Sequence, residues 1–325
     1  MPSPSDITTL AMRYWMLLFF GLQAHTAFAW GFLAHREINR HAVFTLPPAM
    51  FSFYKQHLGY ITENAVNPDK RRYVVEGEAP KHYIDMEYYA DEAHVQDIPR
   101  SWDQAKAQYT EDMRAEHGIL PWHILHVKQA LTRAFRDQDL GRILQLSADI
   151  GHYLADANVP LHTSQNYDGQ LTGQEGIHGL WETRLPELFL STYNLFTGQA
   201  CYVSHPQQAI WAAIIEAHQG VKCALDLEKE LSQRFPQVRK YSFEQKGTTL
   251  RKVYSVAYAQ AYHQLLSGQV EQQMRASIKM VGDFWFTCWV DAGKPPLDNW
   301  LQQPVPEEPD PLPQNQPPSV RVCGD

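Results

Sequence analysis

Cysteine is scarce in this sequence of 325 residues. Only Cys201, Cys223, Cys288 and Cys323 are present, and no two of them stand in C-x-x-C spacing. Their spacing excludes the usual cysteine-based zinc sites and the thioredoxin motif. In an oxidising compartment, Cys201 and Cys223 could close a loop and Cys288 and Cys323 could hold the C-terminal tail, whereas four unpaired thiols are the alternative. The sequence alone permits three pairings.

An excess of positive charge is also missing. The formal net charge of the chain is -8. Long-range attraction to nucleic acid or to an anionic membrane surface is therefore not expected. Neither is excluded as a substrate, because bound metal cations would reverse the local electric field.

Long apolar runs are absent as well. The run YWMLLFFGL at residues 14–22 follows Arg13 and is too short to span a bilayer. Ala27 and Ala29 occupy the small-residue positions of a signal-peptidase site. We expect residues 1–29 to be a signal peptide that is cleaved after Ala29, so that the protein is secreted or periplasmic; an uncleaved anchor is the alternative. No transmembrane span is expected in the mature chain.

Strand patterns of useful length are missing, whereas helical periodicity is frequent. Apolar residues recur at three- and four-residue spacing, and Pro47 and Pro160 mark helix ends. The predicted helices cover residues 35–46, 121–140, 141–158, 207–235, 247–267 and 270–292. Within 247–267, one apolar stripe consists of Leu250, Val253, Tyr254, Ala257, Tyr258, Ala261 and Leu265. Residues 60–120 are expected to form long loops with short helices. The sequence thus predicts an all-α protein, a compact multi-helix bundle with long loops.

The predicted bundle forms one unit over residues 30–292. Nine of the 21 prolines lie between Pro295 and Pro318. A segment of this composition is extended or disordered rather than folded into a domain. Residues 293–325 are therefore predicted to be a Pro-rich C-terminal tail.

Five potential metal ligands lie in one stretch of the sequence. They are His152, Asp156, His162, His178 and Glu182. The first two and the last two are each four positions apart, so that on a helix each pair faces the same way. One such pair is more often a surface hydrogen bond, but five ionisable groups packed together would be costly without a cation. Because zinc takes imidazole and carboxylate ligands where thiolates are absent, the stretch predicts a zinc site.

The order of these residues resembles that of the zinc-dependent phospholipase C and S1/P1 nuclease superfamily. HYLADANVPLH at 152–162 and HGLWE at 178–182 resemble its signature of His-x-x-x-Asp, a proline turn with His, and His-x-x-x-Asp/Glu. Mature chains of the family begin with tryptophan, and here Trp30 follows the expected cleavage site, with His35 in WGFLAH. The resemblance covers residues 30–190. It implies a phospholipase C/P1 nuclease-like helical bundle that holds three zinc ions.

The resemblance implies nine metal ligands in three sets. The first zinc would be held by Asp69, His82, His152 and Asp156. The second would be held by His162, His178 and Glu182. The third would be held by Trp30, His35 and the shared Asp156. Asp69, for which Asp85 and Asp91 are the nearby alternatives, would be the general base or orienting ligand when zinc-activated water attacks phosphorus.

Features of the sequence point to different substrates within the superfamily. Glu182 as the last ligand is similar to the phospholipase branch, and the loop NYDGQLTGQEG differs from the Gly-Gly-Asn loop usual in nucleases. The short spacing from Trp30 to His35 is similar to the nuclease branch. The expected function is a phospholipase C-like phosphodiester hydrolase, with a nuclease of single-stranded DNA or RNA as the alternative. No stable protein partner is implied.

Two non-catalytic interpretations remain beside these. A zinc-binding protein without activity would use the same residues, whereas a di-iron bundle would require repeated Glu-x-x-His pairs instead. The aromatic residues Tyr83, Tyr167 and Trp181 do not decide between substrates, because both a base and a choline head group use aromatic faces.

Several charged residues near the ligands have two interpretations each. Arg71 or Arg72 could hold a phosphate or belong to a solvated loop. Asp85 could orient a ligating histidine or cap a helix. His123 and His126 are expected on a helix surface.

Overall fold

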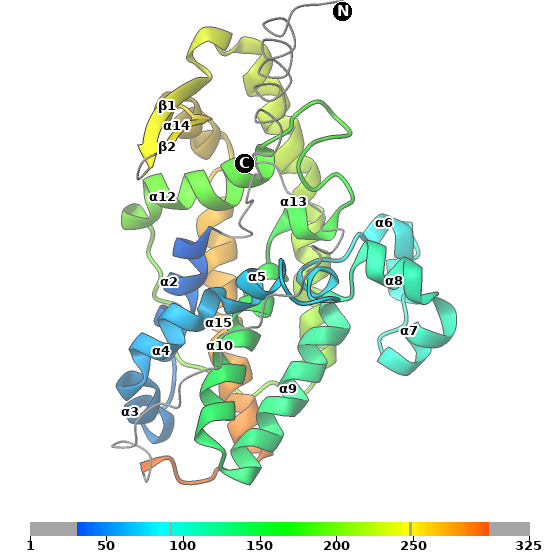
Figure 1. Cartoon of the computed structure of the whole chain (residues 1–325), viewed down its shortest axis with the longest axis vertical. Helices are drawn as coiled ribbons and strands as arrows, with labels where there is room; N and C mark the ends of the chain where they lie inside the picture. Colours follow the sequence, from blue (N-terminus) through cyan, green and yellow to red (C-terminus); the bar gives the residue numbers. More distant parts are fainter. Residues whose placement is uncertain (1–30, 92, 247–248, 299–325) are drawn as a thin grey trace, which may run out of the picture.

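The computed structural model describes residues 31–91, 93–246 and 249–298. The long helices of this part are α2 (Phe32–Val43), α9 (Leu120–Asp137), α10 (Leu140–Asp156), α13 (Pro206–Arg234) and α15 (Gln269–Asp291). They confirm the helices predicted over residues 35–46, 121–140, 141–158, 207–235 and 270–292, with shifts of a few residues at the ends. The fold is all-α, as predicted, apart from one hairpin among the described residues (Figure 1).

Short helices and turns connect the long ones. The short α-helices are α3 (Pro48–Gln56), α4 (Leu58–Glu63), α5 (Asn67–Arg71), α6 (Met86–Tyr89), α7 (Trp102–Gln108), α8 (Glu111–His117), α11 (Ile177–Gly179), α12 (Leu185–Phe189) and α14 (Val256–Leu265). The 3-10 turns are η1 (Asn64–Val66), η2 (Ala79–His82), η3 (Val95–Asp97), η4 (Pro160–Thr163), η6 (Leu190–Thr192) and η7 (Gln237–Arg239). The segment η5 (Leu180–Arg184) is π-helical. Residues 60–120 thus form short helices and loops, as predicted.

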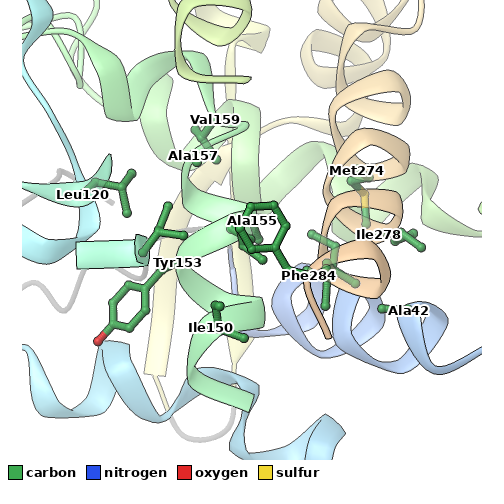
Figure 2. Packing of buried hydrophobic residues seen from close by; sticks show 14 of the residues in the cluster. Ala42, Leu120, Ile150, Tyr153, Ala155, Ala157, Val159, Met274, Ile278 and Phe284 are labelled. Atoms are coloured by element: carbon green, nitrogen blue, oxygen red, sulfur yellow. The ribbon is translucent and has the colours of Figure 1, made fainter. Parts of the chain in front are cut away.

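Helix α10 lies inside the bundle, where it packs against α2, α9 and α15. Figure 2 shows Phe284 of α15 directed toward α10, with Ile278 on the same helix, while Tyr153 leaves α10 on another side. All three side chains are buried. Burying a side chain such as phenylalanine contributes roughly 1.5–3 kcal/mol. This packing fixes the helix that carries two of the predicted metal ligands.

The prediction of a continuous helix over residues 247–267 is wrong in its first part. Strand β1 (Tyr241–Lys246) pairs in antiparallel register with β2 (Thr249–Tyr254), and the helix α14 begins only at Val256. Ser255 ends the strand and caps this helix, because its side chain accepts a hydrogen bond from Tyr258 N at 3.2 Å. Leu250, which was expected on the buried stripe of a helix, is exposed on the hairpin. The expectation that useful strands are absent is therefore also wrong.

One of the two predicted disulfides lies wholly within the described residues. Cys201 and Cys223 are separate, exposed thiols, so the loop-closing pair is not formed, and Cys288 is a buried thiol. Cys323 lies outside the described residues, as do positions 299–325 of the predicted Pro-rich tail. Within the described ranges, no helix combines the length and apolarity needed to cross a bilayer.

Candidate metal centre

Helix α10 and the turn after it supply three of the predicted ligands. His152 Nε2 lies 3.2 Å from Asp156 Oδ2, one helical turn further along, and both side chains are fully buried. The helix ends at Asp156, and Pro160 starts the turn η4 because its ring nitrogen has no hydrogen to donate. The turn returns His162 to the same carboxylate, with Nδ1 3.4 Å from Asp156 Oδ1.

His178 and Glu182 lie where α11 passes into the π-helical segment η5. His178 Nε2 is 3.1 Å from Glu182 Oε1, and His162 Nε2 is 3.4 Å from Glu182 Oε2. The four-residue spacing thus brings the two side chains together, as an α-helical turn would. Single π-helical turns are frequent at functional sites. This segment faces the turn that carries His162.

The remaining described ligands come from the N-terminal part of the chain. On α2, the ring of His35 stacks on that of His152, with centroids 3.8 Å apart, and its Nε2 lies 3.5 Å from Asp156 Oδ1. On η2, His82 Nδ1 lies 3.0 Å from Asp156 Oδ2 and 3.7 Å from Oδ1 of Asp69, which belongs to α5. The N-terminal helices therefore complete the cluster around α10.

Together these side chains form three groups of potential metal ligands, of which the first two share His152. The groups are His35, His152 and Asp156; Asp69, His82 and His152; and His162, His178 and Glu182. Within each group the ligand atoms lie within 4.8 Å of one another. The structure therefore brings together every predicted ligand that it describes. Trp30, the ninth, lies outside the described residues.

Backbone carbonyls orient three of the imidazoles. The Nδ1 pairs are His152 with Ala65 O at 2.9 Å, His162 with His82 O at 2.8 Å, and His178 with Tyr167 O at 2.9 Å. A carbonyl oxygen only accepts, so each Nδ1 carries the hydrogen and donates it. The lone pair then lies on Nε2, which faces Asp69 and Asp156 in the case of His152 and Glu182 in the case of His162 and His178. Such contacts fix the tautomer and ring orientation of metal-ligating histidines.

Burial sets the charge of most groups in the cluster. It lowers the pKa values of His35 and His82 well below the ordinary 6.5 and also lowers that of His152, so these rings are neutral near neutral pH. Burial raises the pKa values of Asp69 and Asp156 above the ordinary 3.8, because two carboxylates close together in a dry site are costly to ionise. The protein alone therefore does not supply the positive charge that these carboxylates require.

Glu182 behaves differently from the two aspartates. Burial raises the pKa of its carboxyl, but the neighbouring His178 and His162 outweigh burial and lower that pKa to about 2. The carboxylate is thus ionised over the whole physiological range. An ionised, fully buried carboxylate between two imidazoles is a suitable ligand for a divalent cation.

Buried polar atoms that lack hydrogen-bond partners indicate whether a metal fits the cluster. Among the described residues, the atoms without a hydrogen-bond partner include both carboxylate oxygens of Asp69 and Glu182, Oδ1 of Asp156, both ring nitrogens of His35 and Nε2 of His82. Leaving a buried polar atom unsatisfied costs about 1–3 kcal/mol, and more for a charged group. Divalent cations would accept these lone pairs and neutralise the carboxylates. The residues present therefore fit a metal centre, and their nitrogen and oxygen donors suit zinc.

A small pocket borders the cluster. It is lined by Arg72, His82, Tyr83, Leu161, His162, Tyr167 and His178. Arg72 is buried, so its guanidinium stands beside the ligating histidines rather than in a solvated loop. Tyr83 and Tyr167 supply aromatic walls, whereas Trp181 is packed in the core and donates its indole N–H to Gln269 Oε1 at 2.9 Å.

Arg71 belongs to an ion-pair network and does not line the pocket. Its Nη2 lies 2.9 Å from Asp149 Oδ2, and its Nε lies 3.6 Å from Glu78 Oε1. Glu78 also accepts hydrogen bonds from Lys81 Nζ at 2.6 Å and from Tyr153 OH at 2.5 Å. The ring of Tyr153 contacts the rings of His82 and His152, so the network is connected to two of the predicted ligands through this tyrosine. It was not predicted from the sequence, because its members come from separate segments.

Other nearby residues take roles that the sequence left open. Asp85 Oδ2 lies 3.3 Å from His117 Nδ1, and as the residue before α6 it makes no side-chain capping bond. His126 is exposed on α9, as expected, whereas His123 is partly buried and packs edge-on against Tyr153 at 4.5 Å. Asp91, an alternative to Asp69, is exposed and pairs with His94.

Comparisons with known proteins leave the family open. No protein-family model matches the sequence, and no curated protein matches it. Two alpha-toxin structures are similar in fold. That of Clostridium perfringens from avian strain SWCP has 11% identity and a TM-score of 0.43, covering 81% of this chain and 64% of the toxin. That of Clostridium absonum has 12% identity and a TM-score of 0.44, covering 83% and 66%. The chain thus spans about two thirds of each toxin, and likeness this distant carries no argument about activity.

Proposed function

We propose that this protein is a zinc-dependent phosphodiester hydrolase of the phospholipase C-like type. The observation that carries the proposal is the convergence of three groups of histidine and carboxylate ligands in one buried cluster. Buried Arg72 and two tyrosines line a pocket beside that cluster. A purely structural metal site would not require such a pocket, because structural sites are closed by protein ligands.

The proposed ligand sets are those that the resemblance of the sequence implies, and the three groups of the cluster support them. One zinc would be held by Asp69, His82, His152 and Asp156, a second by His162, His178 and Glu182, and a third by Trp30, His35 and Asp156. Zinc, when bound, supplies a Lewis acid and lowers the pKa of water toward neutrality. Removal of residues 1–29 on export would free the Trp30 amine, leaving residues 30–292 as the helical domain and residues 293–325 as the tail.

The chain's own groups would position the substrate and move the proton. The Asp69 carboxylate, with two oxygens free of hydrogen bonds among the described residues, would orient the attacking water and accept its proton. Arg72 would donate to a phosphate oxygen from the pocket wall and offset charge on the phosphate in the transition state. Tyr83 and Tyr167 would offer aromatic faces to a choline head group. Glu182 as the final ligand supports a phospholipid rather than a nucleic acid.

The test is turnover by the mature protein with an unblocked Trp30. Choline phospholipid, single-stranded DNA and single-stranded RNA are assayed in parallel, before chelation, after chelation and after zinc is returned. The proposal requires lipid cleavage that chelation abolishes and zinc restores. Zinc-dependent cleavage of nucleic acid alone would make the protein a nuclease, and zinc binding with no cleavage of any substrate would favour a non-catalytic zinc protein.

A matched pair of variants links the activity to the cluster. Asp69→Asn removes a carboxylate of the cluster without changing its size, and Asp91→Asn makes the same change at an exposed aspartate. Turnover should fall at least about 100-fold in the first variant and remain unchanged in the second. Equal turnover in both would remove Asp69 from the mechanism.

A further inference from the structure

The β1–β2 hairpin and its flanks expose apolar side chains to solvent. Phe243 is 69% exposed and Leu250 is 66% exposed. In the observed register, Phe243 lies opposite Lys252 and Leu250 lies opposite Gln245, so both apolar side chains point to the same face of the hairpin. Val238 before the hairpin is 93% exposed and Val256 after it is 49% exposed. Single exposed apolar residues are common, but here two share one face of the hairpin and two more lie in the segments that flank it.

Cationic side chains accompany this apolar patch. Arg239, Arg251 and Lys252 are all exposed. Lys252 pairs with Phe243 and shares its face, whereas Arg251 pairs with Glu244 on the opposite face of the hairpin. Glu244 is the sole acidic residue between positions 238 and 256, and its carboxylate is bound by Arg184 at 3.0 Å. The apolar face is therefore locally positive on a chain of net charge -8. We call the four apolar residues together with Arg239 and Lys252 the hairpin patch.

The base of the hairpin is aromatic and firmly anchored. Lys240 is buried there, with Nζ 3.0 Å from Glu228 Oε1 and 5.0–5.8 Å from the ring centroids of Tyr241, Tyr254 and Tyr258. Apolar and basic side chains at the surface match the chemistry of a membrane interface, and the buried Tyr254 and Tyr258 hold the hairpin that carries them. A rigid base lets the exposed side chains enter a lipid surface without unfolding the hairpin.

The hairpin is also joined to the segment that carries two metal ligands. Arg184, two positions after Glu182, donates from Nε to Tyr254 O at 3.0 Å. Tyr254 OH in turn donates to Glu175 O at 3.3 Å, in the loop that leads to His178. Figure 1 shows the hairpin close to α12, which continues directly from η5. Contacts made by the hairpin patch would therefore hold the metal-binding segment near the same surface.

We propose that the hairpin patch docks this protein on the surface of an anionic lipid bilayer. Phe243 and Leu250 would enter the head-group region, while Arg239 and Lys252 would contact lipid phosphates. This docking rests on the proposed function. It specifies that the substrate would be lipid within a bilayer. Basic residues beside exposed apolar ones favour such a surface, since apolar burial and charge attraction add.

Vesicle sedimentation tests the docking directly. The mature, zinc-loaded protein is mixed with vesicles of phosphatidylcholine alone or of phosphatidylcholine with phosphatidylglycerol, with and without chelator so that binding is also read with lipid turnover stopped. The double variant Phe243→Ser/Leu250→Ser should bind both vesicles at least about tenfold more weakly. Arg239→Gln/Lys252→Gln should weaken binding to anionic vesicles by about fivefold per charge and leave neutral vesicles little affected.

Matched controls separate docking from folding and from catalysis. Phe196→Ser replaces a phenylalanine that is 82% exposed outside the hairpin patch, and Arg133→Gln/Arg136→Gln removes two exposed charges from α9. Both should bind vesicles as the unaltered chain does, and all variants should cleave a short-chain soluble phosphodiester at the unaltered rate. Vesicle binding without any phosphodiester cleavage would support the docking and overturn the proposed function alone. Equal binding by all variants, or no binding to either vesicle, would overturn the docking and leave the hairpin patch to an acidic protein partner.

Discussion

His35 and His152 lie face to face, with ring centroids 3.8 Å apart and planes inclined by 17°. The two rings come from α2 and α10, whose packing brings the ends of a long chain segment together. Burial lowers the pKa of each ring, so both are neutral and the stack carries no charge repulsion. Each ring also has a nitrogen within 3.5 Å of Asp156. Asp156 thus lies beside two rings that the helical packing brings together, and it is also a proposed zinc ligand.

Asp156→Asn should separate two effects of the buried carboxylate: the stability that it costs the metal-free fold and its contribution to zinc binding. In metal-free protein, the free energy of unfolding of the Asn variant should equal that of the unaltered chain or exceed it by up to about 2 kcal/mol, because a buried charge is removed. With zinc, the unaltered chain should be the more stable of the two, since the variant lacks a ligand that two proposed sites share. Urea unfolding with and without zinc measures both effects.

A substitution on the same helix provides the control for this reversal. Arg142 is exposed near the start of α10, so Arg142→Ala should leave the zinc-dependent gain in stability unchanged. If Asp156→Asn kept the full gain from zinc, Asp156 would not be a ligand.

Zinc affinity should rise with pH, and zinc binding should release protons. Burial raises the pKa values of Asp69 and Asp156 above 3.8, so in metal-free protein these carboxyls keep their protons further toward neutral pH. A ligating carboxylate must lose its proton, so zinc competes with protons between 3.8 and the raised values. His35, His82 and His152 do not compete there near neutrality, because their pKa values are lowered.

Titration calorimetry in buffers of different ionisation enthalpy measures this proton release. Asp69→Asn should release fewer protons than the unaltered chain. A zinc affinity that stays level with pH, with no protons released, would contradict the assignment of these carboxylates.

Glu228→Ala should destabilise the fold more than a neighbouring exposed substitution. The buried Glu228 accepts hydrogen bonds from Lys240 Nζ at 3.0 Å, Tyr258 OH at 2.5 Å and Gln174 Nε2 at 2.6 Å. Its removal leaves the buried Lys240 ammonium without its carboxylate, which costs about 3–5 kcal/mol. Glu230→Ala breaks only an exposed pair with Arg234 and should cost less than about 1 kcal/mol. Urea unfolding of both variants checks this, and equal losses would refute it.

Gly151→Ala should disturb the approach of α10 to α2. A methyl group at Gly151 would lie 2.0 Å from Oδ1 of Asn39, whose amide donates to Ala148 O at 3.1 Å. The overlap should cost about 1–3 kcal/mol and move His152 relative to His35. At Gly59, in α4, a methyl group meets nothing within 4 Å, so Gly59→Ala should raise stability by roughly 0.5–1 kcal/mol. Thermal unfolding and zinc affinity measure both, and a neutral Gly151→Ala would show that the helices can move apart freely.

Local patterns predicted much of the fold and most of the cluster. The apolar stripes of α9, α10 and α15 follow helical periodicity, and stripe residues such as Leu131, Ile150 and Ile278 are buried. The spacing of His152 from Asp156 and of His178 from Glu182 also made each pair visible. These features depend on residues a few positions apart, which is why they can be read from the chain.

Features that depend on distant pairing were not predicted. The strand β2 was assigned to a helix because Leu250, Val253 and Tyr254 fit a helical stripe, whereas its partner β1 and its exposed position decide the structure. The contact of Asp85 with His117 and the pairing of Arg71 with Asp149 likewise join separate segments. No local pattern in the sequence indicates such partners.

The zinc content of the purified mature chain, measured by elemental analysis, tests the central claim most directly. With Trp30 as the free first residue, we expect about three zinc ions per chain, retained through gel filtration, because the ligands fall into three sets. A chain that is folded but holds no zinc above background would contradict the metal centre, and with it the proposed function.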